Sequence, residues 1–200
     1  MQVESSKYHL RRICVDICNM TESWLYYIRS GRAAMNNFSR LRLHIFESEN
    51  RLNHLTTERA LRAADKQIRM LYDRLTSPIA MMKRILEQLR ITRDKTCQFL
   101  SCTRMYMDDE ILSEFQITPT LRTPQVLEIL EFLRSRFDAE WEVKEMVVMA
   151  LEDMDTAHEM ELLVKAWDDC SHAGGEEFTE KLNAYFHTVG GGRLRAQNAQ

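Results

Sequence analysis

Hydrophobic residues in the first part of the chain alternate at steps of four and three residues. The alternation starts at Ile13, and only Gly31 and Ser48 interrupt it. A seam sustained over about six heptads is typical of a coiled-coil helix, because one apolar stripe then faces a partner helix throughout. The seam positions are Ile13, Ile17, Met20, Trp24, Tyr27, Gly31, Ala34, Phe38, Leu41, Ile45, Ser48, Leu52 and Leu55.

A second seam with the same spacing begins at Leu61 and weakens toward Thr103, where threonines replace aliphatic residues. Pro78 lies within this seam and is expected to kink the helix, since proline removes one backbone hydrogen bond and clashes with the preceding turn. Between the seams, Thr56 or Thr57 is suited to cap the second helix. The expected seam positions include Leu61, Ala64, Ile68, Leu71, Leu75, Met82, Ile85, Leu89 and Phe99.

Two helices of similar length joined by a short turn favour an antiparallel hairpin over residues 1–107. Pairing of each helix with a second copy of the chain, in parallel, is the alternative that fits the same spacing. We predict an all-α protein in which this long, coiled-coil-like hairpin is followed by a smaller C-terminal helical region.

The second half divides into three segments. Residues 108–123 form an acidic, Pro- and Thr-containing connector, and residues 124–189 hold the C-terminal helices. Thr123 followed by Pro124 is typical of a helix start, and Thr156 with Glu159 fits a capping box. Residues 190–200 begin with three glycines and continue with polar residues, so we expect a disordered tail.

The two halves of the chain carry opposite net charges, although the net charge of the whole chain is only −3. Residues 1–107 contain 19 Lys and Arg against 10 Asp and Glu, whereas residues 108–200 contain 8 against 20. A basic half and an acidic half can attract each other or bind different partners.

The chain contains no sequence motif that predicts catalysis. We found no phosphate-binding loop, glycine-rich dinucleotide motif, His-Glu-x-x-His or nucleophile elbow, so we expect a protein that is not an enzyme and has no cofactor. No stretch approaches the roughly 20 apolar residues of a membrane span. The polar N-terminus has no apolar signal core, and five cysteines suit a reducing compartment. We therefore expect neither membrane insertion nor secretion.

The cysteines offer one metal hypothesis beside the expectation of no metal. If the hairpin turns near residue 56 or 57, Cys14 and Cys18 lie opposite Cys97 and Cys102. Four converging thiols can hold zinc, although the spacing is not the usual Cys-x₂-Cys. The alternative is that the four are small hydrophobic residues beside the seam.

Two charged stripes follow the helical period. The basic stripe is Arg59, Arg62, Lys66 and Arg69. Either both stripes are solvated faces, or they meet within the chain or across an interface. Direct nucleic-acid binding is not expected, because the basic stripe lacks a dense cluster with interleaved aromatic residues. The acidic stripe consists of Glu128, Glu131, Asp138, Glu142, Glu145 and Glu152.

Two further sets of residues are candidate sites. Thr118 and Thr123 each precede proline and are candidate phosphorylation sites, with helix capping as the alternative for Thr123. Large aromatic residues carry much of the binding energy at interfaces. The candidate interaction anchors are therefore the following aromatic residues, for which an ordinary place in the core is the alternative: Trp24, Tyr27, Phe38, Trp141 and Trp167.

Residues 19–195 resemble the cyclin-dependent kinase 2-interacting protein family. Glu22-Ser23-Trp24 followed by Ile28 is similar to the family's early tryptophan segment, and Pro119-Thr120 to its Trp-Pro-Thr connector, although Thr118 stands where the family has Trp. The C-terminal helices contribute further matches, and Gly192-Arg193-Leu194 resembles the family's Gly-x-Arg ending. The matches in the C-terminal helices are Phe137, Glu140, Lys144, Val147, Leu151 and Trp167.

The resemblance implies a nuclear, in part cytoplasmic, adaptor linked to DNA replication, cell-cycle kinases and checkpoint signalling. It also implies a non-catalytic subunit of a AAA-type ATPase assembly in ribosome biogenesis and replisome turnover, paired with another small helical subunit. Independently of it, the heptads also suit a coiled-coil subunit of a tethering or kinetochore assembly. The basic hairpin suits a nucleic-acid-binding protein.

Overall fold

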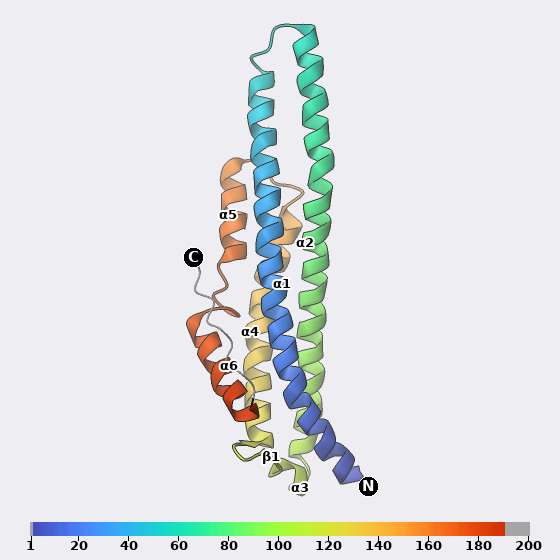
Figure 1. The fold of residues 1–200 in the computed structure, drawn as a ribbon, viewed down its shortest axis with the longest axis vertical. Coiled ribbons are helices and arrows are strands. Elements are labelled where there is room, and N and C mark those ends of the chain that lie inside the picture. Colours follow the sequence, from blue (N-terminus) through green and yellow to red (C-terminus); the bar gives the residue numbers. More distant parts are fainter. Residues whose placement is uncertain (1, 191–200) are drawn as a thin grey trace. The chain divides into compact units, whose positions relative to one another are not determined.

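The computed structural model describes residues 2–190 of the 200-residue chain. It is 84% helical, with six helices and one very small sheet, which confirms the predicted all-α class. Helix α1 (Gln2–Leu52) and helix α2 (Glu58–Met107) are the two long helices of the predicted hairpin and pack against each other within one chain (Figure 1). The expected disordered tail lies outside the described residues, apart from Gly190.

The two predicted seams are the buried faces of α1 and α2. Trp24 and Ile45 on α1, and Met82 and Leu89 on α2, are fully buried. Burial weakens near the turn, where Leu55 is exposed. Helix α2 begins directly after Thr57, whose carbonyl accepts from the amide of Leu61 at 3.0 Å. It continues through Pro78 as one helix.

The predicted connector contains short regular elements. Asp109 caps α3 (Glu110–Ser113) by accepting hydrogen bonds from the amides of Ile111 and Leu112. A two-stranded antiparallel sheet follows, formed by β1 (Gln116–Thr118) and β2 (Leu121–Arg122).

Three helices make up the C-terminal region: α4 (Thr123–Ala150), α5 (Ala157–Asp168) and α6 (Glu176–Val189). The capping box predicted for Thr156 and Glu159 is present at the start of α5. Helix α6 ends at Gly190, which adopts the left-handed conformation (φ 82°) that glycine favours at this position.

The chain folds into two compact units that are discontinuous in sequence. Unit 1 comprises 1–26, 89–141 and 170–200, and unit 2 comprises 27–88 and 142–169. Both long helices contribute to each unit, so neither unit corresponds to one half of the sequence. We describe each unit by itself.

Candidate interaction site

Trp24 is a core residue of unit 1. Its indole stacks on Phe137 with 4.1 Å between ring centroids and an interplanar angle of 18°. Phe137 also contacts Phe178 of α6, and Tyr185 and Phe186 of the same helix are buried as well. The Trp24 ring therefore stabilises its own chain and presents no surface to a partner.

Trp167 is a buried core residue of unit 2. Its ring packs against Gly31, the glycine that interrupts the first seam. A Cβ added to Gly31 would lie 2.0 Å from Cζ2 of Trp167, so the indole occupies the space that a side chain at this position would need. The Trp167 indole N–H donates to the carbonyl of Ile28 at 3.3 Å. Gly31, which interrupts the heptad pattern in the sequence, thus leaves the space that the distant Trp167 ring occupies. We call this space the Trp167 socket.

A buried lysine holds the end of α5 beside this socket. The Lys144 ammonium donates to the carbonyl oxygens of Ala166 (3.1 Å), Trp167 (2.7 Å) and Asp169 (3.2 Å). The carbonyls of Ala166 and Trp167 lie in the last turn of α5, and that of Asp169 belongs to its C-cap. Carbonyls at this end of a helix lack intrahelical donors and carry the negative end of the helix dipole. Sequence reasoning placed Lys144 only as a match to the family pattern and missed this role.

Tyr27 and Trp141 are partly exposed, unlike the two buried tryptophans. The Tyr27 hydroxyl donates to the Gln88 side chain at 3.3 Å in unit 2. In unit 1 the Arg93 guanidinium lies 4.1 Å from the centroid of the Trp141 ring. Both aromatic side chains therefore already have partners within the chain, although part of each surface remains accessible.

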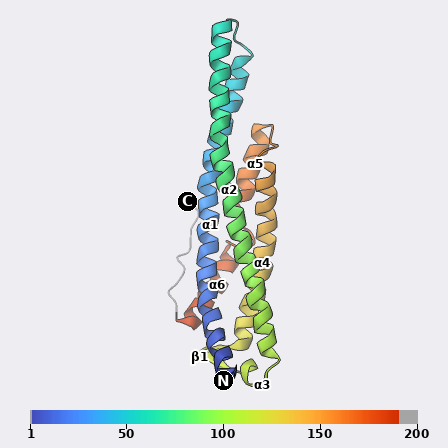
Figure 2. The ribbon, with the colours of Figure 1, turned by 90° about the vertical axis from the view of Figure 1, so that its right-hand side faces the viewer.

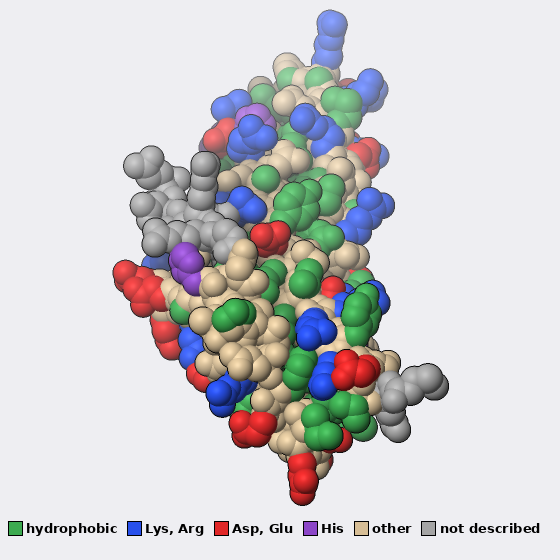
Figure 3. All heavy atoms as spheres, turned by 60° about the horizontal axis from the view of Figure 1, so that its bottom comes forward, with side chains coloured by type: hydrophobic (Ala, Val, Ile, Leu, Met, Phe, Trp, Pro, Cys, Tyr) green, Lys and Arg blue, Asp and Glu red, His purple; other side chains and the backbone are tan. Residues whose placement is uncertain are grey.

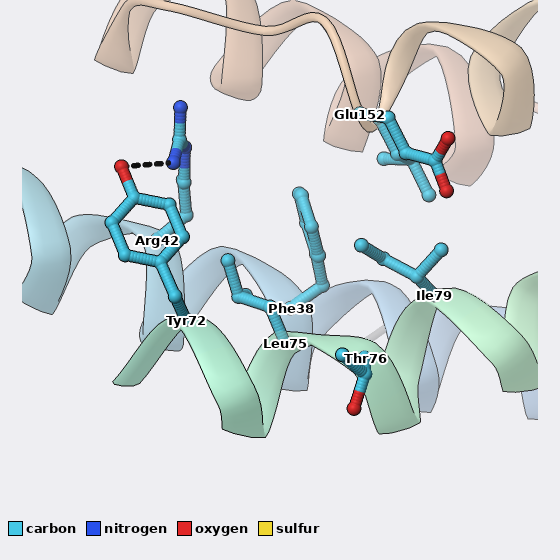
Figure 4. A pocket seen from close by; sticks show the side chains of 8 residues that line it. Phe38, Arg42, Tyr72, Leu75, Thr76, Ile79 and Glu152 are labelled. Atoms are coloured by element: carbon cyan, nitrogen blue, oxygen red, sulfur yellow. Dashed lines mark hydrogen bonds between the residues drawn. The ribbon is translucent and has the colours of Figure 1, made fainter. Parts of the chain in front are cut away.

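Phe38, the fifth predicted anchor, lies at the base of an apolar hollow of about 160 Å³ in unit 2. Phe38, Leu75 and Ile79 point into the space between α1, α2 and the segment that follows α4 (Figure 4). For scale, an apolar cavity of about 150 Å³ is enough for benzene. The full lining is Phe38, Arg42, Tyr72, Leu75, Thr76, Ile79, Leu151 and Glu152.

Polar contacts at the rim of the hollow fix its shape. The Arg42 guanidinium donates to the Tyr72 hydroxyl (3.2 Å) and to the Met154 carbonyl (2.6 Å). Tyr72 in turn donates to Glu49 at 2.8 Å. These bonds join α1, α2 and the loop after α4, so the hollow has ordered walls before any partner binds.

The four cysteines do not form the hypothesised zinc site. Within residues 2–190, no group of three or more His, Cys, Asp or Glu side chains is placed to hold a metal ion. Cys14 is buried against Tyr185 of α6, and burial raises the pKa of the Cys14 and Cys18 thiols to about 11. Opposed positions in a hairpin were insufficient, because Cys14 faces α6 rather than α2. Of the four, Cys14 is buried and the other three are partly exposed.

The two candidate phosphorylation sites have different surroundings in unit 1. Thr123 is fully buried, and its hydroxyl donates to the carbonyl of Leu112 at 2.6 Å rather than capping α4. Thr118 is partly exposed and donates to the carbonyl of Thr188 at 2.9 Å, at the end of α6. A kinase would reach Thr118 more readily than Thr123.

Residues of the acidic stripe form ion pairs within the chain, but their partners are not the residues of the basic stripe. Three acidic residues pair with α2: Glu131 with Arg104 (2.9 Å) and Asp138 with Arg93 (3.8 Å) in unit 1, and Glu152 with Lys83 (2.6 Å) in unit 2. Among the residues that the structure describes, no ion pair joins the two stripes. The four basic side chains are all exposed.

Comparison with known proteins gives no assignment. No family model matches the chain, and no curated protein matches it at a significant level. The resemblance to the cyclin-dependent kinase 2-interacting protein family therefore stays a hypothesis. Of its matched residues, Phe137, Glu140, Lys144 and Trp167 are buried, and Gly192-Arg193-Leu194 lies outside the described residues.

Proposed function

We propose that this protein is a non-enzymatic helical adaptor, the subunit through which other proteins are held in a larger complex. The observation that carries the proposal is a set of large apolar side chains that are exposed on helices whose inner face is already buried. On α4, Val147 and Val148 are buried, yet Met146 and Met149 are 59% and 68% exposed. A helix that is only packed on one side normally presents a polar outer face.

Exposed methionines are the recurrent feature of this surface. Five of the twelve methionines have large exposed fractions, and apolar side chains reach the surface between charged ones in the space-filling view (Figure 3). Methionine is flexible and polarizable, and it is over-used at surfaces that bind several partners. The exposed methionines are Met70, Met81, Met105, Met146 and Met149.

The particular complex is proposed from the family resemblance: a nuclear, in part cytoplasmic, assembly with a AAA-type ATPase and another small helical subunit, and with cell-cycle kinases in DNA replication and checkpoint signalling. The burial of Glu140 and Lys144 supports the resemblance. Glu140 accepts hydrogen bonds from the amides of His172 and Ala173, each at 3.0 Å. Accidental similarity between heptad proteins would place Glu and Lys on the surface, where these residues usually lie.

No partner that spans a membrane is invoked. Of the helices that the structure describes, none combines the length and the apolar character needed to cross a bilayer.

The test is recovery of the tagged protein from nuclear extract treated with nuclease, with the partners identified by mass spectrometry. A AAA-type ATPase in near-stoichiometric amount, or cell-cycle kinases, retained in high salt, is the expected result. Vesicle-tethering or kinetochore subunits would replace the family assignment and leave an adaptor. Binding that depends on nucleic acid and falls steeply with salt would instead indicate a nucleic-acid-binding protein.

A further inference from the structure

Basic residues occur at seven-residue intervals along one face of α2. Positions 62, 69, 76, 83, 90, 97 and 104 are basic except for Thr76 and Cys97. Seven residues correspond to two turns of a coiled-coil helix, so these side chains lie on one face. The basic members are Arg62, Arg69, Lys83, Arg90 and Arg104.

One acidic residue of α4 and one in the turn that follows it pair with this face. Glu131 and Glu152 are 21 residues apart, as are their respective partners Arg104 and Lys83 on α2. The order of the pairs is reversed between the two segments, as it is for antiparallel helices. Two acid-to-base pairs, one in each unit, thus connect this face of α2 to α4 and to the segment that follows it.

The helical neighbour ends before the basic face does. Helix α4 stops at Ala150, and Glu152 makes the last pair. In unit 2, α1 and α2 continue toward their turn beyond α5 and the end of α4, and no other described helix lies beside them there (Figures 1 and 2). Arg69 and Arg62 are the next two basic positions on the same face, and both side chains are 78% exposed.

Neither arginine is committed to a tertiary contact that the structure describes. Arg69 pairs with Asp65 at 2.9 Å and Arg62 pairs with Glu58, each within a single turn of α2. Exposed pairs of this type contribute little to stability. Both guanidinium groups can therefore be redirected to another carboxylate at small cost.

The apolar hollow lies between the last pair and the two arginines. Its residues on α2 are Tyr72, Leu75, Thr76 and Ile79, which fall between Arg69 and Lys83. Apolar side chains at its base and a polar rim are the arrangement of an interface hot spot, where one anchor side chain is shielded from water. The volume suits a single aromatic or branched aliphatic side chain.

We propose that this surface, the hollow together with Arg62 and Arg69, binds an acidic amphipathic helix of a partner protein, antiparallel to α2 and in continuation of α4. The partner places an apolar side chain in the hollow and carboxylates at seven-residue spacing against the two arginines. The proposal rests on the adaptor function and names the chemistry of one partner. The hollow favours an acidic helix over a nucleic-acid backbone, because a helix can supply the apolar side chain that fills it.

The experiment uses the full chain and a designed probe. The probe is a fluorescein-labelled helical peptide with Glu at every seventh position and one Phe on the same face, and binding is read by fluorescence anisotropy. Two control peptides carry Lys in place of Glu, or Ala in place of Phe. We expect the Glu peptide to bind at least tenfold more tightly than either control.

Charge reversal on the chain sharpens this test. The double variant R62E/R69E should bind the Glu peptide at least tenfold more weakly and should now prefer the Lys peptide. The matched control R59E/K66E makes the same charge change on the same helix, at positions outside the seven-residue series, and should stay within about twofold of the wild type. The variant Ile79→Trp fills the hollow and should weaken binding without changing the charge preference. Circular dichroism checks the fold of each variant.

Two results with the peptides would overturn the proposal: no preference for the Glu peptide, or equal effects of R62E/R69E and R59E/K66E. It would also be overturned if the wild type bound a mixed-sequence oligonucleotide, R62E/R69E did not, and neither bound the Glu peptide. Concentration-dependent dimerisation that R62E/R69E abolishes would assign the face to a second copy and also overturn it. If R62E/R69E still recovers the ATPase or kinases from extract at the wild-type level, the docking site is wrong and the adaptor function stands. If the wild type recovers no stoichiometric partner, the adaptor function fails, whatever the peptide result.

Discussion

Unit 1 and unit 2 both place further helices beside the long hairpin, but they differ in how fully this space is filled. In unit 1, rings from α1 and α6 contact Phe137 of α4 on the inside of the packed helices. In unit 2, one tryptophan and one lysine secure α5, and the hairpin then continues with only two helices. The closed packing of unit 1 stabilises the chain, whereas in unit 2 part of the hairpin is left uncovered, and this is the surface that we propose for a partner.

The largest expected losses of stability follow from replacing the two buried tryptophans, and the two replacements should loosen different parts of the chain. Trp24→Ala and Trp167→Ala should each lower the free energy of unfolding by about 3–5 kcal/mol, because each removes a large, fully buried ring. Hydrogen exchange should rise in α6 and the first part of α4 for Trp24→Ala, and in α5 for Trp167→Ala. Identical exchange maps for the two variants would contradict the division into two units.

The buried lysine should have the next largest effect. Lys144→Met removes the donor to three carbonyls at the end of α5 and should cost about 2–3 kcal/mol. Lys181→Met is the control in unit 1, because Lys181 makes only an exposed pair with Glu128 and should cost about 1 kcal/mol or less. Urea denaturation of both variants measures the difference, and equal losses would remove Lys144 as the clamp of α5.

Substitution of Gly31 by alanine should destabilise the wild type but stabilise a variant that lacks the Trp167 ring. Gly31→Ala in the wild type should cost about 1–3 kcal/mol, because its Cβ would overlap the Trp167 ring. In a Trp167→Ala background the same substitution should stabilise by about 1 kcal/mol, since alanine favours the helix and the space is empty. A double-mutant cycle from thermal and urea unfolding measures the coupling. A penalty in both backgrounds would mean that the ring is not the obstacle.

The smallest effect concerns the start of α5 and depends on pH. Thr156→Ala should cost about 1 kcal/mol through loss of the cap. Hydrogen bonds from the Asp155 amide and from Thr156 hold the pKa of the Glu159 carboxyl below its ordinary value of 4.5. A depressed folded-state pKa means that this stabilisation is complete above pH 4.5 and is lost as the pH falls below it.

Unfolding curves of the wild type and Glu159→Gln between neutral pH and pH 3 provide the measurement. The wild type should lose its advantage over Glu159→Gln as the solution is acidified. A difference that does not change with pH would exclude the carboxylate as the stabilising group.

Much of the fold followed from local patterns. The heptad spacing located both seams, Thr57 preceded α2 as expected, and the capping box at Thr156 and Glu159 is present. The predicted anchors were less informative, since Trp24, Phe38 and Trp167 are buried in the chain itself. Large aromatic residues favour interfaces and cores for the same reason, and a sequence alone does not tell which of the two contains them.

The sequence by itself determined the helices, their caps and the charge of their faces, because these depend on residues within a few turns of one another. Only the tertiary structure decided which partner each face receives. Gly31 accommodates Trp167, Cys14 faces Tyr185, and Lys144 binds the last turn of α5, across separations that no local period encodes. The basic face beyond the end of α4 was visible in the sequence as a stripe, but its availability depends on where the third helix stops.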